Sequence, residues 1–207
     1  MLHFLVRPMR DSDVGQAAAL QRSCFPAPFP EELLWTEEHL RRHIELFPEG
    51  QFVALGEVGV IGSASNCIVS ENAWFAHRSW DETVGGPMLR NHDRMGSTLY
   101  GLDISVHPDC RGSGVMRALY SARFELVEEL GLARYGTAVR IPGFADYELQ
   151  NSGVSPEDYV QAVVDGRAAD RTLTPMLRVG LRPVGVIRDY MEDPESHNCA
   201  AVLEWHR

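Results

Sequence analysis

Residues Arg111-Gly112-Ser113-Gly114 form a short glycine-rich segment between a predicted strand and a predicted helix. The first backbone N–H groups of a helix have no intrahelical partner, and the helix dipole places partial positive charge there. The glycines leave room for a bulky anion to approach these groups, and Arg111 adds a full positive charge. This combination predicts a phosphate-binding site. The alternative is a helix that merely turns on glycine where it begins.

Three kinds of phosphate-binding loop can be compared with this segment. The P-loop pattern G-x-x-x-x-G-K-[ST] is excluded because the chain has no lysine. The dinucleotide pattern G-x-G-x-x-G fits Gly112 and Gly114 but has Arg117 where the third glycine belongs. The pattern R-x-x-G-x-[GA], which binds the pyrophosphate of coenzyme A, fits Arg111 and Gly114 and departs only at Met116. A nucleotide-binding domain unrelated to coenzyme A stays open as another interpretation.

The elements that must position this loop follow from hydrophobic periodicity and from turn residues. Strands are expected at residues 3–7, 51–55, 58–69, 99–106, 135–140, 181–187 and 200–205, and helices from Asp11 to the prolines of 26–30, over 30–47, 115–130 and 155–166, and through Met176. Two long segments, 70–97 and about 141–171, have no clean period. The order predicts one α/β domain over 1–207, with a mixed sheet, a central β-α-β unit and an insertion at about 141–171.

Composition narrows the class of partner. The 19 basic and 29 acidic residues give a net charge of −10, which argues against nucleic acid and mildly favours cationic substrates such as amines. The four cysteines form no C-x-x-C pair, and His92-Asp93 has no further ligands at metal spacing, so we expect no metal. With no long apolar segment and no signal peptide, we expect a cytoplasmic protein without a membrane partner.

The sequence resembles the GNAT superfamily of acyl-CoA-dependent N-acyltransferases. Its central motif, V-x-P-x-x-R-G-x-G between a strand and an apolar helix, is similar to LYGLDISVHPDCRGSGVMRALY (99–120), and MLRVGLRPVGVI (176–187) is similar to its last helix and strand. Three further segments, RIPGFADY (140–147), SPEDYVQAVVDG (155–166) and AVLEW (201–205), resemble the GNAT domain that precedes a nitrilase-like carbon–nitrogen hydrolase domain in longer proteins. We expect that domain to stand alone here.

The resemblance implies a fold and a cofactor site. The expected fold is a mixed, mostly antiparallel central sheet flanked by helices, with a splayed central strand and a helical insertion before the last helix. Acetyl-CoA would be the co-substrate. The resemblance assigns its pantetheine to the backbone of Ile104, Ser105 and Val106, and its pyrophosphate to the loop formed by Arg111, Gly112, Ser113, Gly114, Val115 and Met116. The N–H of Val106 would face the thioester carbonyl.

The acid–base groups depart from the pattern of the family. Many relatives have a glutamate near the position of Tyr100, and the carboxylate on this strand is instead Asp103, a candidate base acting through water or a structural aspartate. Many relatives also have a tyrosine that protonates the thiolate, where this chain has Met176. Tyr147 is the first candidate substitute and Tyr190 the second, and water can also supply the proton.

Alternation along a regular strand would sort the side chains of 99–106 onto two faces. The expected sorting places Gly101, Asp103 and Ser105 on one face and the set Tyr100, Leu102, Ile104 and Val106 on the other.

The acceptor is expected to be the amine of a small molecule or a peptide, acylated directly in a ternary complex. The aromatic segment WFAHRSW (74–80) could wall its site, or could be pinned to the core by its two tryptophans. The alternative function is a catalytically weak or inactive regulatory module that binds acyl-CoA. Because relatives often dimerise, a homodimer is one expected assembly.

Overall fold

The computed structural model describes residues 2–26 and 31–207. Within these residues, seven strands form one sheet with the order β1-β2-β3-β4-β5-β7-β6. The pairing of β4 with β5 is parallel, and the other neighbours are antiparallel. The bounds are β1 Leu5–Pro8, β2 Phe52–Gly56, β3 Gly59–Val69, β4 Thr98–Val106, β5 Arg134–Arg140, β6 Arg182–Ile187 and β7 Ala200–Trp205. The mixed, mostly antiparallel sheet is therefore confirmed.

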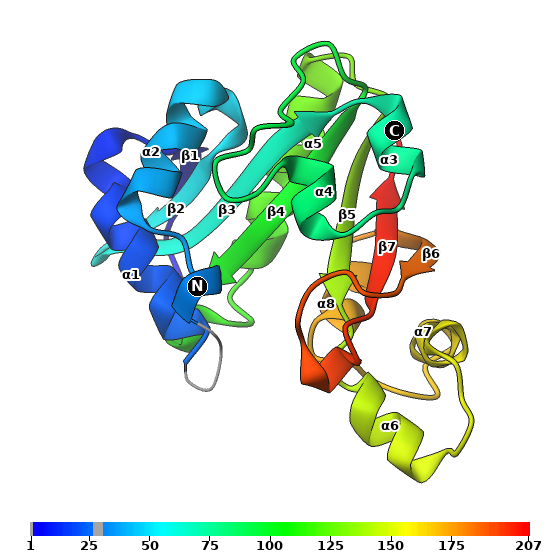
Figure 1. The fold of residues 1–207 in the computed structure, drawn as a ribbon. Coiled ribbons are helices and arrows are strands. Elements are labelled where there is room, and N and C mark those ends of the chain that lie inside the picture. The colour runs from blue at the N-terminus through cyan, green and yellow to red at the C-terminus, as the bar shows by residue number, and fades with distance from the viewer. Residues whose placement is uncertain (1, 27–30) are drawn as a thin grey trace.

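Helices cover both faces of this sheet. They are α1 Val14–Cys24, α2 Glu37–Leu46, α3 Glu71–Phe75, α4 Trp80–Val84, α5 Val115–Glu129, α6 Phe144–Gln150, α7 Pro156–Val164 and α8 Leu173–Arg178. Figure 1 shows α4 in front of the strands and α5 behind them. The largest core cluster includes side chains of α5, α7 and α8 on one face of the sheet, and α1 and α2 pack on the other. Val53 and Ala54, which are neighbours on β2 and so point to opposite faces, belong to these two different clusters.

Most expected elements are present, with boundaries shifted by one or two residues. The helix expected over 30–47 is shorter: in its described part a single 3-10 turn at Glu31–Leu33 precedes α2, which begins after Thr36. The Thr36 side chain accepts from His39 N and caps the helix there. The proline segment 27–30 lies outside the described residues.

The insertion of 141–171 holds two helices rather than one. The expected helix is α7, where Ser155 and Asp158 form the capping box that the sequence predicts. The other, α6, begins at Phe144 without a side-chain cap, so its start carried no signal in the sequence. In Figure 1 both helices lie beyond the end of β5, and α7 contacts β6 and joins the main core cluster.

The central strand β4 separates from β5 after a short contact. Only Thr98–Tyr100 pair with β5, at Arg134–Gly136, and Figure 1 shows the two strands diverging from there. On its other side β4 stays paired with β3 as far as Val106. The splayed strand that the resemblance implies is thus present.

The expected alternation along β4 is wrong because the strand contains a β-bulge. Ser65 pairs with Asp103 but Asn66 pairs with Gly101, so Leu102 has no partner. The extra residue reverses the order of the faces: Tyr100 and Leu102 pack with the α3–α4 side, whereas Ile104 and Val106 pack with the α5 side.

Candidate active site

The glycine-rich loop ends in an open helix N-terminus. Gly112 and Gly114 have φ values of 76° and 95°, in the left-handed region that favours glycine. A Cβ at either position would meet nothing within 4 Å, so both face open space. Gly114 is the N-cap of α5 and provides no side-chain cap, and the first intrahelical bond runs from Ala118 N to Gly114 O at 3.0 Å. The amides of residues 115–117, which precede that bond, are therefore available to an anion.

The other loop side chains leave these amides uncovered. Arg111 is exposed. Ser113 Oγ donates to Cys110 O at 2.5 Å, so its hydroxyl fixes the turn. Met116, the residue that departs from the coenzyme A pattern, packs partly buried against the core on the α5 side. The bulky residue is thus accommodated by the core.

The backbone of residues 104–106 lies between this loop and the point where the strands separate. Because β4 is not paired with β5 there, this edge of Ile104, Ser105 and Val106 has no strand partner. The Val106 carbonyl accepts a hydrogen bond from Cys24 Sγ at 3.2 Å. An extended chain entering the gap between the strands could pair with this edge, as a pantetheine does through its amides.

Asp103 faces α1 from the same stretch of β4. Burial raises the pKa of its carboxyl, although hydrogen bonds from Gln21 and Ser105 and the charge of Arg123 act in the opposite direction. Burial and the charge of Asp103 together raise the pKa of the Cys24 thiol. Asp103 is therefore a carboxyl with a perturbed pKa beside the candidate thioester site, as a general base would be.

The two candidate tyrosines lie elsewhere. Tyr147 on α6 packs against Tyr159, with ring centroids 5.1 Å apart and ring planes tilted by 50°, and within the described residues no contact joins it to Asp103. Tyr190 is buried, and its hydroxyl lies 3.0 Å from that of Tyr100. Met176 is a core residue of α8. The catalytic role of Tyr147 stays a prediction.

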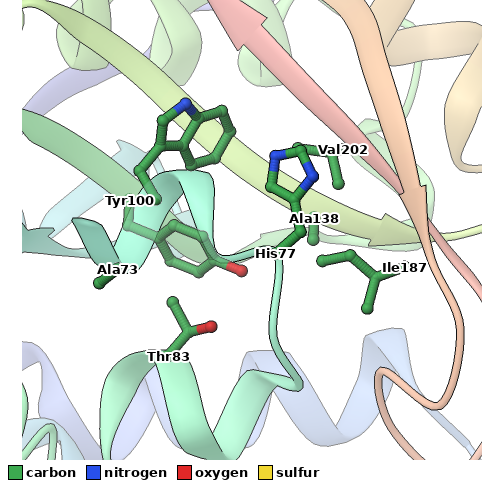
Figure 2. Close-up of a pocket in the computed structure, with 8 residues that line it drawn as sticks. Ala73, His77, Thr83, Tyr100, Ala138, Ile187 and Val202 are labelled. Atoms are coloured by element: carbon green, nitrogen blue, oxygen red, sulfur yellow. The ribbon is translucent and has the colours of Figure 1, made fainter. Parts of the chain in front are cut away.

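The aromatic segment of 74–80 covers the sheet on the side opposite α5. Trp74 is buried, and four residues from 73–83 enclose a cavity of about 10 Å³, roughly the room of one water. Its floor is Tyr100 of β4, Ala138 of β5, Ile187 of β6 and Val202 of β7. Figure 2 shows the Tyr100 hydroxyl and the Ile187 side chain on different sides of this space. The cavity thus adjoins Tyr100, the last residue of β4 that pairs with β5.

Sequence reasoning missed a polar cluster beneath the bulge. Arg123 of α5 donates to the carbonyl oxygens of Ser65 and Asp103, and Thr137 Oγ1 donates to Gly101 O at 2.9 Å. One signal was available. The buried residues of α5 include Leu119, Tyr120, Arg123, Leu126 and Val127, so the arginine occupies a core position in the helical pattern.

The described residues contain no group of His, Cys, Asp and Glu that could hold a metal ion. In the same part of the chain, no helix combines the length and the apolar character needed to cross a membrane.

Comparison with known proteins identifies the family. The model of the Acetyltransferase (GNAT) family matches residues 15–145. The uncharacterized N-acetyltransferase YkwB of Bacillus subtilis is 37% identical over 97% of this chain and 87% of its own. The probable hydrolase YhcX of the same organism is 30% identical over 98% of this chain, which spans 38% of that protein.

A solved structure extends the match across the whole fold. The GNAT-like decarboxylase GphF, in complex with isobutyryl-CoA, is 26% identical and superposes with a TM-score of 0.76 over 98% of each chain. Family and fold together account for the splayed strand, the glycine-rich loop and the helix that follows it. The chain belongs to the GNAT family and is an acyl-CoA-dependent acyltransferase of the N-acetyltransferase type.

Proposed function

We propose that this enzyme transfers the acetyl group of acetyl-CoA directly to the amine of a small molecule or a peptide, within a ternary complex. The observation that carries the proposal is the uncapped N-terminus of α5 directly after the splayed strand β4. Its free amides suit a pyrophosphate, and the unpaired edge of Ile104–Val106 suits the pantetheine and the thioester. The acidic chain, with a net charge of −10, favours a cationic acceptor.

In this reaction the amine nitrogen forms a bond to the thioester carbonyl, and the C–S bond then breaks. We propose Asp103 as the base that takes the ammonium proton through water before the attack. The N–H of Val106 is proposed to stabilise the oxyanion. Tyr147 remains our candidate for returning a proton to the thiolate. In the structure Tyr147 contacts Tyr159, so this role requires α6 to move toward the thioester.

A second reaction, on a different acyl-CoA thioester bound at the same site, is favoured by two observations. GphF, which superposes over nearly the whole chain, is a decarboxylase, and Met176 replaces the tyrosine expected of an N-acetyltransferase. A β-carboxyacyl thioester loses CO2 as its Cα–carboxyl bond breaks. The electron pair forms an enolate, which takes a proton at Cα. The same Val106 N–H would stabilise the enolate oxygen.

Calorimetry and a turnover assay test these proposals together. We expect heat on titration with acetyl-CoA, none with NAD, and release of free thiol when acetyl-CoA is supplied with a panel of amines. Binding without thiol release would support the alternative, a regulatory module that binds acyl-CoA. Release of CO2 from malonyl-CoA would support decarboxylation. If acetyl-CoA does not bind while ATP or NAD does, the assignment of the loop to coenzyme A is wrong.

A further inference from the structure

Arg123 is a buried arginine that forms no contact ion pair among the described residues, although its charge lowers the pKa of the nearby Asp103 carboxyl. Its residue surface is 1% exposed, and it is the largest side chain that α5 buries fully. No ion pair joins it to an acidic side chain in the described part of the chain, and its Nε has no hydrogen-bond partner. Its guanidinium carbon lies 5.1 Å from the Tyr120 ring and 5.4 Å from the Tyr135 ring. The guanidinium is thus held by the rings and hydroxyls of the two tyrosines and by backbone carbonyl oxygens, and its charge also acts on the Asp103 carboxyl.

Folding stability alone does not require a charged residue at this position. Moving a guanidinium out of water is costly, and carbonyl dipoles repay that cost less fully than a carboxylate does. Apolar residues of similar size often replace buried charged groups without loss of stability. The position belongs to an otherwise apolar helix face, where a methionine would pack against the same tyrosine rings.

The hydrogen bonds of Arg123 indicate what it does instead. Its Nη2 donates to Ser65 O at 3.2 Å and also to Asp103 O. These two residues are the last pair in register before the bulge, since the next pair is Asn66 with Gly101. One guanidinium therefore fixes both strands at the position where the β3–β4 register shifts.

The bulge also lies where the sheet opens. β4 leaves β5 after Tyr100, one residue before Gly101, and Gly101 O accepts from Thr137 of β5. A Cβ at Gly101 would lie 1.9 Å from the Tyr135 hydroxyl, so a side chain at this position would have to displace the Tyr135 side chain. Arg123 thus acts at the point that sets both the direction of β4 and the orientation of the amides that follow the bulge.

We propose that Arg123 is a positioning residue for the acyl group: it holds the β4 bulge in the register that directs the N–H groups of Ile104 and Val106 away from β3 and toward the thioester. This inference rests on the proposed function, because it assumes that acetyl-CoA occupies the gap between the strands. Arg123 acts through the backbone, whereas the loop of 111–116 holds the pyrophosphate. Its loss should therefore affect contacts with the acyl group far more than contacts with the nucleotide.

The test uses Arg123→Met, with Arg134→Met as the matched control. Arg134 is also a buried arginine, 8% exposed, but it pairs with Glu71 and Thr98 at the opposite end of β5. For each variant we would measure affinity for acetyl-CoA and for free coenzyme A, unfolding in urea, and the ¹³C shift of carbonyl-labelled acetyl-CoA when bound. We would also follow thiol release with the best amine from the panel, or CO2 release if decarboxylation is found.

We expect Arg123→Met to bind free coenzyme A as the wild type does, to lose the wild-type carbonyl shift, and to turn over roughly a hundredfold more slowly. Arg134→Met should lose stability but keep the shift and the turnover. A wild-type carbonyl shift with full turnover in Arg123→Met would overturn the inference, and so would equal losses in both variants. If the wild type binds no acetyl-CoA, the proposed function fails instead.

Arg123→Lys covers the case in which the methionine variant does not fold. Lysine keeps the positive charge but concentrates it on one nitrogen, which fixes two carbonyl oxygens less rigidly than a planar guanidinium. We expect it to fold, with a shifted carbonyl signal and faster hydrogen exchange at the amides of 101–106. Wild-type exchange and a wild-type signal would contradict the positioning role.

Discussion

Asp103 combines two properties that a base at this site needs. Its carboxyl lies on the strand whose backbone is proposed to hold the thioester, and burial raises its pKa above the ordinary value for aspartate. The opposing influences are local: Gln21 on α1, Ser105 on its own strand and the Arg123 guanidinium from α5. The charge of Asp103 in turn raises the pKa of the Cys24 thiol on α1. A carboxyl held in this balance is sensitive to single substitutions.

Replacing Asp103 with asparagine should separate chemistry from binding. A base works only when ionised, so wild-type turnover should rise with pH through the raised pKa of Asp103. Asp103→Asn should lower turnover, abolish that rise and leave affinity for coenzyme A unchanged. Its control is Asp81→Asn, which changes an exposed carboxylate on α4. Unaltered turnover and an unaltered pH profile would remove Asp103 from the mechanism.

The same substitution has a predicted effect on stability. Because the folded state holds the Asp103 proton more tightly than the unfolded state does, the contribution of this group to the free energy of unfolding falls as pH rises through its pKa. Asp103→Asn should therefore be more stable than the wild type near neutral pH, and this advantage should shrink as the pH falls through the pKa of Asp103. Urea unfolding at several pH values measures this difference, and a variant of lower stability throughout would indicate a structural role.

At the scale of elements, α5 has a glycine of positive φ at each end, and we expect only the first of these glycines to lie at a ligand site. Gly114 at its start and Gly131 after its end both have positive φ, at 95° and 64°, and a Cβ at either would meet nothing within 4 Å. A glutamate is strained at both positions: by about 1 to 2 kcal/mol in the left-handed conformation of Gly131, and by more at Gly114, whose φ lies beyond the range of that conformation. Only at Gly114 would its carboxylate occupy the site proposed for the pyrophosphate.

We therefore expect Gly114→Glu to abolish coenzyme A binding and Gly131→Glu to preserve it. Isothermal calorimetry on the two variants measures this, and thermal melts check that both fold. If Gly114→Glu keeps wild-type affinity, the loop is not the pyrophosphate site. If both variants lose affinity together, the effect comes from strain in α5.

The elements that depend on local pattern could be predicted from sequence, and those that depend on pairing could not. Ser155 and Asp158 mark the start of α7 in any context, and the glycines around Arg111 indicate the loop before α5. The bulge at Leu102 exists only because β3 and β4 pair with shifted register, so strict alternation placed Ile104 on the wrong face. The role of Arg123 depends on the same pairing. The candidate site was thus predicted in its loop and strand, but without the group that fixes their geometry.

At the scale of the whole molecule, the sheet consists of two parts with a narrow connection. β1–β4 form one part and β5–β7–β6 the other, and the strands that join them share three residue pairs. The helix α5 packs against strands of both parts, and Arg134 on β5 bonds Thr98 on β4. Within the second part, Arg140 at the end of β5 binds Asp193 in the connection between β6 and β7. Its Nε and Nη2 each donate to one carboxylate oxygen at 2.6 Å. Beyond those three pairs β4 and β5 are not bonded to each other as strands, so a ligand between them would connect the two parts.

A ligand that spans this gap should stabilise the fold as a whole. Acetyl-CoA at about a hundred times its Kd would raise the free energy of unfolding by about 2.7 kcal/mol. For a chain of 207 residues that unfolds in one step this corresponds to a rise in Tm of roughly 5 to 10 °C. Hydrogen exchange should slow on both sides of the gap, at residues 104–106 of β4 and 137–140 of β5. Protection confined to the loop of 111–116 would show that the nucleotide binds without the pantetheine entering between the strands, and Gly114→Glu should show neither effect.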